Sequence, residues 1–149
     1  MVDITGKIRV FVYGSHKKGH PLHDLIKRGK SEYVGRRMIH DRLAMTSMGA
    51  FPALIDHEKE TRHVYGEVYV VDHETLAALD MAEGHPNFYK RRKLWTVPKG
   101  NEKALRVWTY ILTPEAASYT EDTIEPAVWR PTNEEKEWVD EHERQLAQG

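Results

Sequence analysis

The sequence predicts a single domain in which β-strands alternate with short helices. The chain of 149 residues has the size of one ordinary domain, and it is 40% hydrophobic and 30% charged. Apolar side chains follow the two-residue period of strands in some segments and the helical period in others. A formal net charge of −1 gives no overall attraction to nucleic acid or to an anionic membrane.

The N-terminal part begins with a strand and a helix. Residues 8–13 send apolar side chains alternately to two faces, which predicts a strand. The segment 21–29 is expected to be a short helix, because Pro21 suits a first helical position. Residues 30–62 show no clear period, apart from a strand at a sheet edge around Pro52, which cannot donate to a ladder.

The middle of the chain contains the most regular patterns. HVYGEVYVV, residues 63–71, is expected to be a strand, and a helix should follow with Asp72 as its N-cap and an end near Gly84. Two further strands are predicted over residues 88–97 and 104–112, separated by a turn. The order of elements is therefore strand, helix, strands, helix and strands.

Several kinds of site are not expected. The chain has no cysteine, which excludes disulfides, thiolate nucleophiles and thiolate metal ligands. His16, His20 and His23 lie close in sequence, but Gly19 and Pro21 would break a helix across them. On spacing alone they are expected to be surface histidines, and no metal is expected.

The sequence also predicts the compartment and excludes two partners. No apolar run approaches the roughly 20 residues of a membrane span, and the N-terminus lacks the apolar centre of a signal peptide. Basic clusters such as residues 90–93 are balanced by acidic residues and are expected to be solvated rather than bound to nucleic acid. We therefore expect a cytoplasmic protein with neither a membrane nor a nucleic acid as partner.

The loop after the first strand is the first candidate site. In RVFVYGSHKKGHP, residues 9–21, an apolar strand stops at Gly14 and is followed by Ser15 and two lysines. Such a loop can present backbone N–H groups to an anion, and Gly14 would let a carboxylate approach the backbone closely. The alternative is an ordinary strand-to-helix turn that happens to contain Lys17 and Lys18.

The second candidate is a carboxylate at a helix end. Glu83 precedes Gly84 and Pro86 at the end of the predicted helix, with Tyr89 six residues later. A carboxylate between apolar elements can be partly desolvated and can act as a base. The alternative is an exposed glutamate without a role.

These two features occur together in a fixed order, and the combination resembles the γ-glutamylcyclotransferase-like family, which includes γ-glutamylamine cyclotransferases and AIG2-like proteins. VFVYGSHKKG corresponds to the family opening V-Y-G-[ST]-L-[KR]-x-G, and YGEVYVVD and LDMAEGHPNFYKRR follow it. The resemblance covers about residues 8–112. It is closest to the γ-glutamylamine branch, because residues 83–89 fit E-x-x-P-x-x-Y. His16 replaces the family leucine, a change that bears on the identity of the substrate.

The resemblance implies an α+β fold, with a compact mixed sheet curled toward a small barrel and short helices around it. The family-like domain would span residues 7–112. Residues 113–149 would form a C-terminal extension that packs on the same body. Its terminal helix is predicted from Thr132 and Glu135, which form a capping box.

The resemblance also implies a reaction without cofactor or metal. A small γ-glutamyl-amine or γ-glutamyl peptide would release 5-oxoproline, because its own α-amine attacks its γ-carbonyl. Glu83 would be the general base. The residues that would bind the substrate are Tyr13, Gly14, Ser15, His16, Tyr89 and, as a weaker candidate, Tyr110.

Two alternatives remain open beside the enzyme. One is a non-catalytic module that binds a carboxylate ligand or a protein partner. The other is a lyase or acyl-transfer activity on a larger γ-glutamylated molecule, for which the basic loop would be suggestive. The sequence predicts no oligomeric state.

Overall fold

The computed structural model describes residues 7–20, 22–117 and 123–148, and its largest element is a five-stranded sheet in the order β2-β5-β1-β7-β6. The central strand β1 pairs antiparallel with β5 and parallel with β7. The strands of this sheet are β1 (Ile8–Val12), β2 (Glu32–Asp41), β5 (Arg62–Val71), β6 (Tyr89–Trp95) and β7 (Arg106–Leu112). A smaller sheet has the order β4-β3-β8 and consists of β3 (Leu43–Ser47), β4 (Pro52–Asp56) and β8 (Thr123–Ile124).

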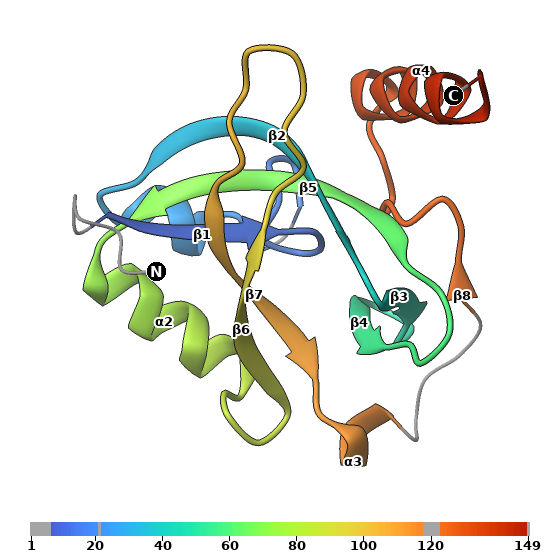
Figure 1. The fold of residues 1–149 in the computed structure, drawn as a ribbon. Coiled ribbons are helices and arrows are strands. Elements are labelled where there is room, and N and C mark those ends of the chain that lie inside the picture. The colour runs from blue at the N-terminus through green and yellow to red at the C-terminus, as the bar shows by residue number, and fades with distance from the viewer. Residues whose placement is uncertain (1–6, 21, 118–122, 149) are drawn as a thin grey trace.

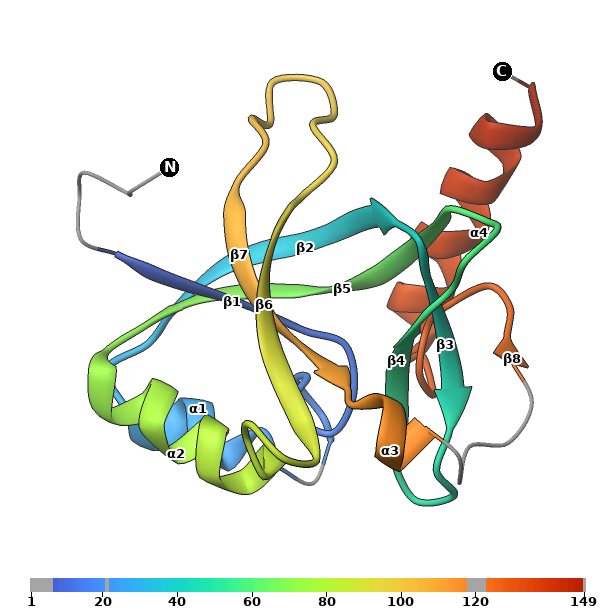
Figure 2. The same ribbon diagram turned by 60° about the horizontal axis from the view of Figure 1, so that its bottom comes forward.

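The large sheet is so strongly curled that its two edges meet. Ile39 of the edge strand β2 forms a bridge with Thr96, which directly follows the opposite edge strand β6. Beside it, the N–H of Val97 donates to the carbonyl of Met38 at 2.8 Å. In the part of the chain that the structure describes, a single bridge joins the edges, rather than a full ladder. This confirms the predicted α+β fold with a curled mixed sheet (Figures 1 and 2).

Four helices surround the sheets in the described part of the chain. In Figure 2, α1 and α2 lie together on the left, and in both views α4 lies on the right, the side of the small sheet, away from α2 (Figures 1 and 2). None of the described helices is long and apolar enough to span a membrane. The helices are α1 (Asp24–Arg28), α2 (His73–Glu83), α3 (Pro114–Ala117) and α4 (Asn133–Gln148).

The predicted helix caps are confirmed. The carboxylate of Asp72 accepts a hydrogen bond from the N–H of Thr75 at 2.8 Å, and Gly84 ends α2 in the left-handed conformation with φ 66°. Before α4, the N–H of Thr132 donates to Glu135 and the N–H of Glu135 donates to the Thr132 hydroxyl, each at 3.1 Å. These two bonds form the capping box expected from the sequence.

The central strand β1 separates two hydrophobic layers. Val10 and Val12 face the layer covered by α1 and α2, while Phe11 and Tyr13 face the interior between the two sheets. This is the alternation predicted for residues 8–13. Gly66 of β5 lies against the same strand, because a Cβ there would be 2.5 Å from the Val12 oxygen and 2.7 Å from the Phe11 ring.

The segment without a clear period contains two strands that the sequence did not predict, β2 and β3. The pairing of β2 with β5 shifts register between Tyr33 and Gly35, which interrupts the alternation of faces. The strand at Pro52 is confirmed at the edge of the small sheet. The helix expected over residues 21–29 is shorter, Asp24–Arg28, and Pro21 lies outside the described residues.

Candidate active site

A cavity of about 240 Å³ opens where β1 ends. All the site residues named from the sequence line it, although they come from four separate segments of the chain. The cavity is smaller than the roughly 300–1,000 Å³ of sites for drug-sized ligands, and it therefore suits a small molecule. The named residues are Tyr13, Gly14, Ser15, His16, Glu83, Tyr89 and Tyr110, and the remaining wall consists of Phe11, Val12, Leu22, Phe51, Pro52, Ala82 and Phe88.

The loop after β1 folds into a tight turn that leaves backbone donors unused. The N–H of Lys17 donates to the Gly14 carbonyl at 3.0 Å, and the N–H of Leu22 donates to the Ser15 carbonyl at 2.8 Å. Among the described residues, the N–H groups of Gly14, Ser15 and His16 have no hydrogen-bond partner. Three successive free donors beside a cavity can bind an anion such as a carboxylate.

Gly14 is required by its packing against the small sheet. A Cβ at this position would lie 2.6 Å from Cγ and 2.9 Å from Cδ of Pro52 in β4. The sequence predicted that a glycine here lets a carboxylate approach the backbone. The contact with Pro52 is a second reason for a glycine, because any larger residue would first press on β4.

His16 is buried and touches Glu83. Its Nε2 atom is 2.9 Å from Oε1 of Glu83, and its Nδ1 atom is 3.2 Å from the carbonyl oxygen of Leu22. The contact with Glu83 is close without the alignment of a good hydrogen bond, and Nε2 has no other partner in residues 7–20, 22–117 and 123–148. The expectation of a surface histidine is therefore wrong for His16.

The partners of the two ring nitrogens of His16 bear on where its hydrogen lies. A carbonyl oxygen only accepts hydrogen bonds, so the contact with Leu22 assigns a hydrogen to Nδ1 of His16. A neutral ring would then turn the lone pair of Nε2 toward the carboxylate of Glu83. Contact at 2.9 Å is favourable when a proton is present on either Nε2 or the carboxyl group.

Glu83 owes its position to the end of α2. It is the last residue of the helix, and the left-handed Gly84 then turns the chain away. The side chain of Glu83 is 19% exposed, so that it faces the cavity and is partly shielded from water. This is the partly desolvated carboxylate that the sequence pattern indicated.

The three tyrosines line the wall of the cavity, and their hydroxyl groups already donate to other protein groups. The hydroxyl of Tyr13 donates to the carbonyl of Tyr110 at 2.6 Å, and that of Tyr89 donates to the carbonyl of Pro52 at 2.7 Å. The hydroxyl of Tyr110 donates to Asp80 at 2.7 Å. Burial is the main cause that raises the pKa of all three hydroxyls, so they stay neutral. Their contribution to a bound ligand is therefore mainly ring surface.

Asp80 and Arg91 support this wall, and reasoning from the sequence missed them. The guanidinium Nε of Arg91 in β6 donates to both carboxylate oxygens of Asp80, at 2.8 and 3.1 Å. Asp80 also accepts the bond from Tyr110, so it joins α2 to β6 and β7. Its place in the motif LDMAEG, three residues before Glu83 and thus on the same side of the helix, is the signal that could have indicated it.

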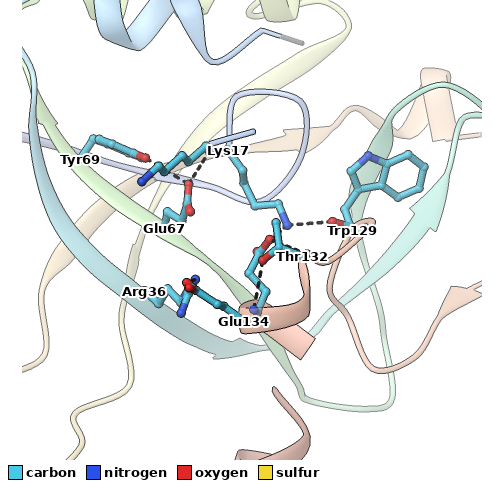
Figure 3. A network of polar contacts seen from close by, with 9 residues as sticks. Lys17, Arg36, Glu67, Tyr69, Trp129, Thr132 and Glu134 are labelled. Carbon is cyan, nitrogen blue, oxygen red and sulfur yellow. Dashed lines mark hydrogen bonds and ion pairs between the residues drawn. The ribbon is translucent and has the colours of Figure 1, made fainter. Parts of the chain in front are cut away.

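The buried side chain of Lys17 ties the loop to the segment before α4 and to the first turn of that helix. This side chain is fully buried, and its Nζ atom lies 2.8 Å from the Trp129 carbonyl and 2.8 Å from a carboxylate oxygen of Glu135. Figure 3 shows Lys17 reaching from the loop to Trp129 and the first turn of α4. Burial alone would raise the pKa of Glu135, but the hydrogen bond and charge of Lys17 hold it below its usual value.

The loop is therefore less basic toward a ligand than its sequence suggests. Lys17 is neutralised inside the protein, and the backbone N–H of Lys18 donates to Glu67 at 2.8 Å. The hydroxyl of Tyr69 donates to the same carboxylate at 3.1 Å (Figure 3). The alternative of an activity on a larger γ-glutamylated molecule, for which a basic loop was suggestive, therefore loses the support of one of the two lysines.

The described residues contain no group of three or more histidine, aspartate or glutamate side chains arranged to hold a metal ion. His23, the third histidine of the N-terminal cluster, hydrogen-bonds through Nδ1 to the carbonyl of His16 at 2.8 Å. This contact adds a further support to the loop.

Comparisons with known proteins agree with this fold. The family described as "Gamma-glutamyl cyclotransferase, AIG2-like" matches residues 10–139. Gamma-glutamylaminecyclotransferase C of Danio rerio is 30% identical over 141 residues, which cover 89% of this chain and 88% of that protein. Gamma-glutamylaminecyclotransferase of Bos taurus is 31% identical over 114 residues, covering 72% and 68%.

A solved structure has the same fold. The crystal structure of an AIG2-like protein from Mus musculus superposes with a TM-score of 0.62 at 24% sequence identity. The match covers 85% of this chain and 97% of the mouse chain. The curled sheet with its surrounding helices is thus shared across nearly the whole length of that protein.

Proposed function

This chain belongs to the gamma-glutamyl cyclotransferase, AIG2-like family, and from that premise we propose that it releases 5-oxoproline from a small γ-glutamyl amide. The substrate's own α-amine is the nucleophile, so the protein needs to supply orientation and proton transfer rather than a nucleophile. The observation that carries the proposal is the placement of Glu83 in the same small cavity as the free N–H groups of the loop.

The loop binds the α-carboxylate in this proposal. The three free N–H groups of Gly14, Ser15 and His16 are the donors, and Lys17 holds the loop in place from inside the protein. Tyr89 and Tyr110 enclose the methylenes of the glutamyl group with their rings. A glutamyl chain held at its carboxylate and packed along its length is brought close to its ring-closed shape. Such orientation contributes several kcal/mol to an intramolecular reaction.

Glu83 moves the protons. The substrate enters with an α-ammonium group, which cannot attack until it gives one proton to the carboxylate of Glu83. The amine nitrogen then forms a bond to the γ-carbonyl carbon, and the bond from that carbon to the leaving nitrogen breaks. The attacking nitrogen loses a second proton, and both protons end on the leaving amine. No water is consumed, and the products are 5-oxoproline and a protonated amine.

His16 positions the base. Its Nε2 contact holds the carboxylate of Glu83 toward the loop, and the bond from Nδ1 to Leu22 fixes the ring. His16 acts through Glu83 and not on the substrate's reacting atoms.

The test is direct. The purified protein is incubated with a panel of γ-glutamyl amides and γ-glutamyl dipeptides, and 5-oxoproline is measured by mass spectrometry. Appearance of 5-oxoproline together with the free amine, at a rate that depends on enzyme concentration, supports the proposal. If the protein binds these compounds but leaves all of them intact, it is a non-catalytic binding module instead.

A further inference from the structure

We propose that the leaving amine of the substrate carries an apolar, uncharged substituent, so that the substrate is the γ-glutamyl amide of an alkyl or aryl monoamine. This inference rests on the proposed function and concerns the outer half of the same cavity. It comes from two independent observations, which are the nature of the residues at the mouth and the charges that line the wall.

The mouth of the cavity is apolar and exposed. Leu22 is 44% exposed and Phe88 is 36% exposed, while Phe51 is half-buried beside them. The residues at the base, such as Phe11 and Val12, are almost fully buried. Apolar side chains that are left partly open around a cavity gain free energy when a ligand covers them.

The aromatic rings form a continuous path from the base to the mouth. The ring of Tyr89 lies 5.2 Å from that of Phe88 in an edge-to-face arrangement, and Phe88 lies 6.5 Å from Phe51, also edge to face. Tyr89 is buried whereas Phe88 is exposed, so the path leads outward. A leaving group that passes from the reacting carbonyl toward water would lie along these rings.

The charges of the wall disfavour an amino acid as leaving group. An α-amino acid carries a carboxylate on the carbon next to the amide nitrogen, close to the reacting carbonyl and therefore to Glu83. Within the described wall, no lysine or arginine lines the cavity, and the only histidine is His16, which already touches Glu83. The carboxylate would lose water, meet no new donor and be repelled by Glu83.

A second positive charge on the leaving amine is also disfavoured. A diamine would place its distal ammonium among Leu22, Phe51 and Phe88, where no described carboxylate lines the mouth. An alkyl chain of the same length makes the apolar contacts without that desolvation cost. The geometry therefore favours a monoamine over both an amino acid and a diamine.

Three matched substrates test the proposal. γ-Glutamyl-butylamide, γ-glutamyl-norvaline and γ-glutamyl-putrescine share the same carbon chain next to the amide, and the last two add one carboxylate or one ammonium. We expect kcat/KM for the butylamide to exceed that of each charged partner by about tenfold or more. Along the methyl, ethyl, propyl and butyl amides, kcat/KM should rise about twofold to fourfold per methylene.

Variants locate the effect at the mouth. Phe88→Ala and Leu22→Ala should each flatten the rise along the alkyl series, so that the ratio of butylamide to methylamide falls at least threefold, on the order of one methylene contact. Met81→Ala is the matched control, because Met81 is 85% exposed on the adjacent turn of α2 and does not line the cavity. That variant should keep the wild-type ratio. Thermal unfolding of each variant checks that it is folded.

The outcomes separate the two levels of the proposal. If the norvaline or putrescine compound is turned over as fast as the butylamide, the apolar leaving group is wrong while the cyclotransferase function stands. A ratio unchanged by both mouth variants would also overturn it. If none of the compounds yields 5-oxoproline, the proposed function itself fails.

Discussion

The Nε2 atom of His16 lies 2.9 Å from Oε1 of Glu83, which brings the loop after β1 into contact with the last residue of α2. In the family opening pattern that residues 10–19 resemble, leucine stands at the position of His16, and a leucine side chain could not make this polar contact. It joins the proposed anion-binding loop to the proposed base. The first two predictions concern these two residues.

Glu83→Gln should lower kcat by about 10²-fold or more, because it keeps the shape of the side chain and removes the proton acceptor. Substrate binding and thermal stability should change little. Steady-state kinetics measure kcat and KM, and a thermal melt measures stability. Glu74→Gln, at an exposed position in the first turn of the same helix, is the control and should behave as wild type. A Glu83→Gln protein with near wild-type turnover would refute the assignment of the base.

His16→Leu should leave the fold intact while lowering kcat about tenfold, which is less than the roughly 10²-fold or more expected for loss of the base, because Glu83 is still present but no longer held. KM should stay close to that of the wild type. The decisive measurement is the pH profile of kcat, because loss of the 2.9 Å contact with Glu83 should change that profile if the contact takes part in proton transfer. A profile that is superimposable on the wild type would show that the contact has no role in proton transfer.

Gly14→Ala should destabilise the protein by about 1–3 kcal/mol, the usual cost of forcing an extra carbon into a packed site. The new Cβ would lie 2.6 Å from Cγ of Pro52. Pro52→Ala removes that atom, so the double variant should recover part of the loss. A double-mutant cycle of unfolding free energies measures the coupling. Additive losses would mean that the glycine is needed for another reason.

Glu135→Gln should cost about 3–5 kcal/mol, because it leaves the buried ammonium of Lys17 without a countercharge. Gln keeps the acceptor of the capping box, so the loss can be assigned to the ion pair. The lowered pKa of Glu135 means that its contribution is present above the ordinary carboxyl pKa of about 4.3. It is lost as pH falls through the lowered value. Chemical denaturation at pH 7 and pH 3 should therefore show a smaller difference between wild type and variant in acid.

A histidine cluster should make the protein less stable below about pH 6.5. The rings of His40 and His63 stack with centroids 4.1 Å apart, and His142 of α4 lies 5.9 Å from His63. Burial, followed by neighbouring cations, lowers the pKa of both His63 and His142. The unfolded chain therefore takes up protons first, and stability falls as pH decreases below 6.5.

The measurement is the unfolding midpoint between pH 7.5 and 5.5. His63→Asn should reduce the dependence on pH, whatever its effect on the midpoint at pH 7.5. His73→Gln changes an exposed histidine at the start of α2 and should leave the slope unchanged. Equal slopes in wild type and His63→Asn would contradict the prediction.

Local chemistry made parts of this structure predictable from the sequence. Asp72 and Thr75, like Thr132 and Glu135, are three residues apart, so each cap could be read without knowledge of the fold. The alternation in β1 was equally clear. The strand β2 was missed because its bulge near Gly35 breaks the alternation, and what places it beside β5 is a distant pairing.

In the candidate site, too, the local features could be predicted from the sequence and the contacts between distant segments could not. The residue types at Glu83 and in the loop followed a known pattern, and the structure gathers them around one cavity. The burial of Lys17 could not be predicted, because its partners are Trp129 and Glu135, far along the chain. The contact between His16 and Glu83 likewise depends on how β1 and α2 are placed by the whole sheet.

The buried position of β1 on both faces limits how the N-terminal segment can change in length. Insertion of one residue into Ile8–Val12 would exchange the side chains of Val10 and Phe11 between two layers that differ in shape. It would also advance the following loop by about 3.3 Å relative to α2. Libraries that aim to alter the substrate of this protein should therefore keep the spacing from Ile8 to His16 constant and vary length only at the mouth of the cavity, around Phe51.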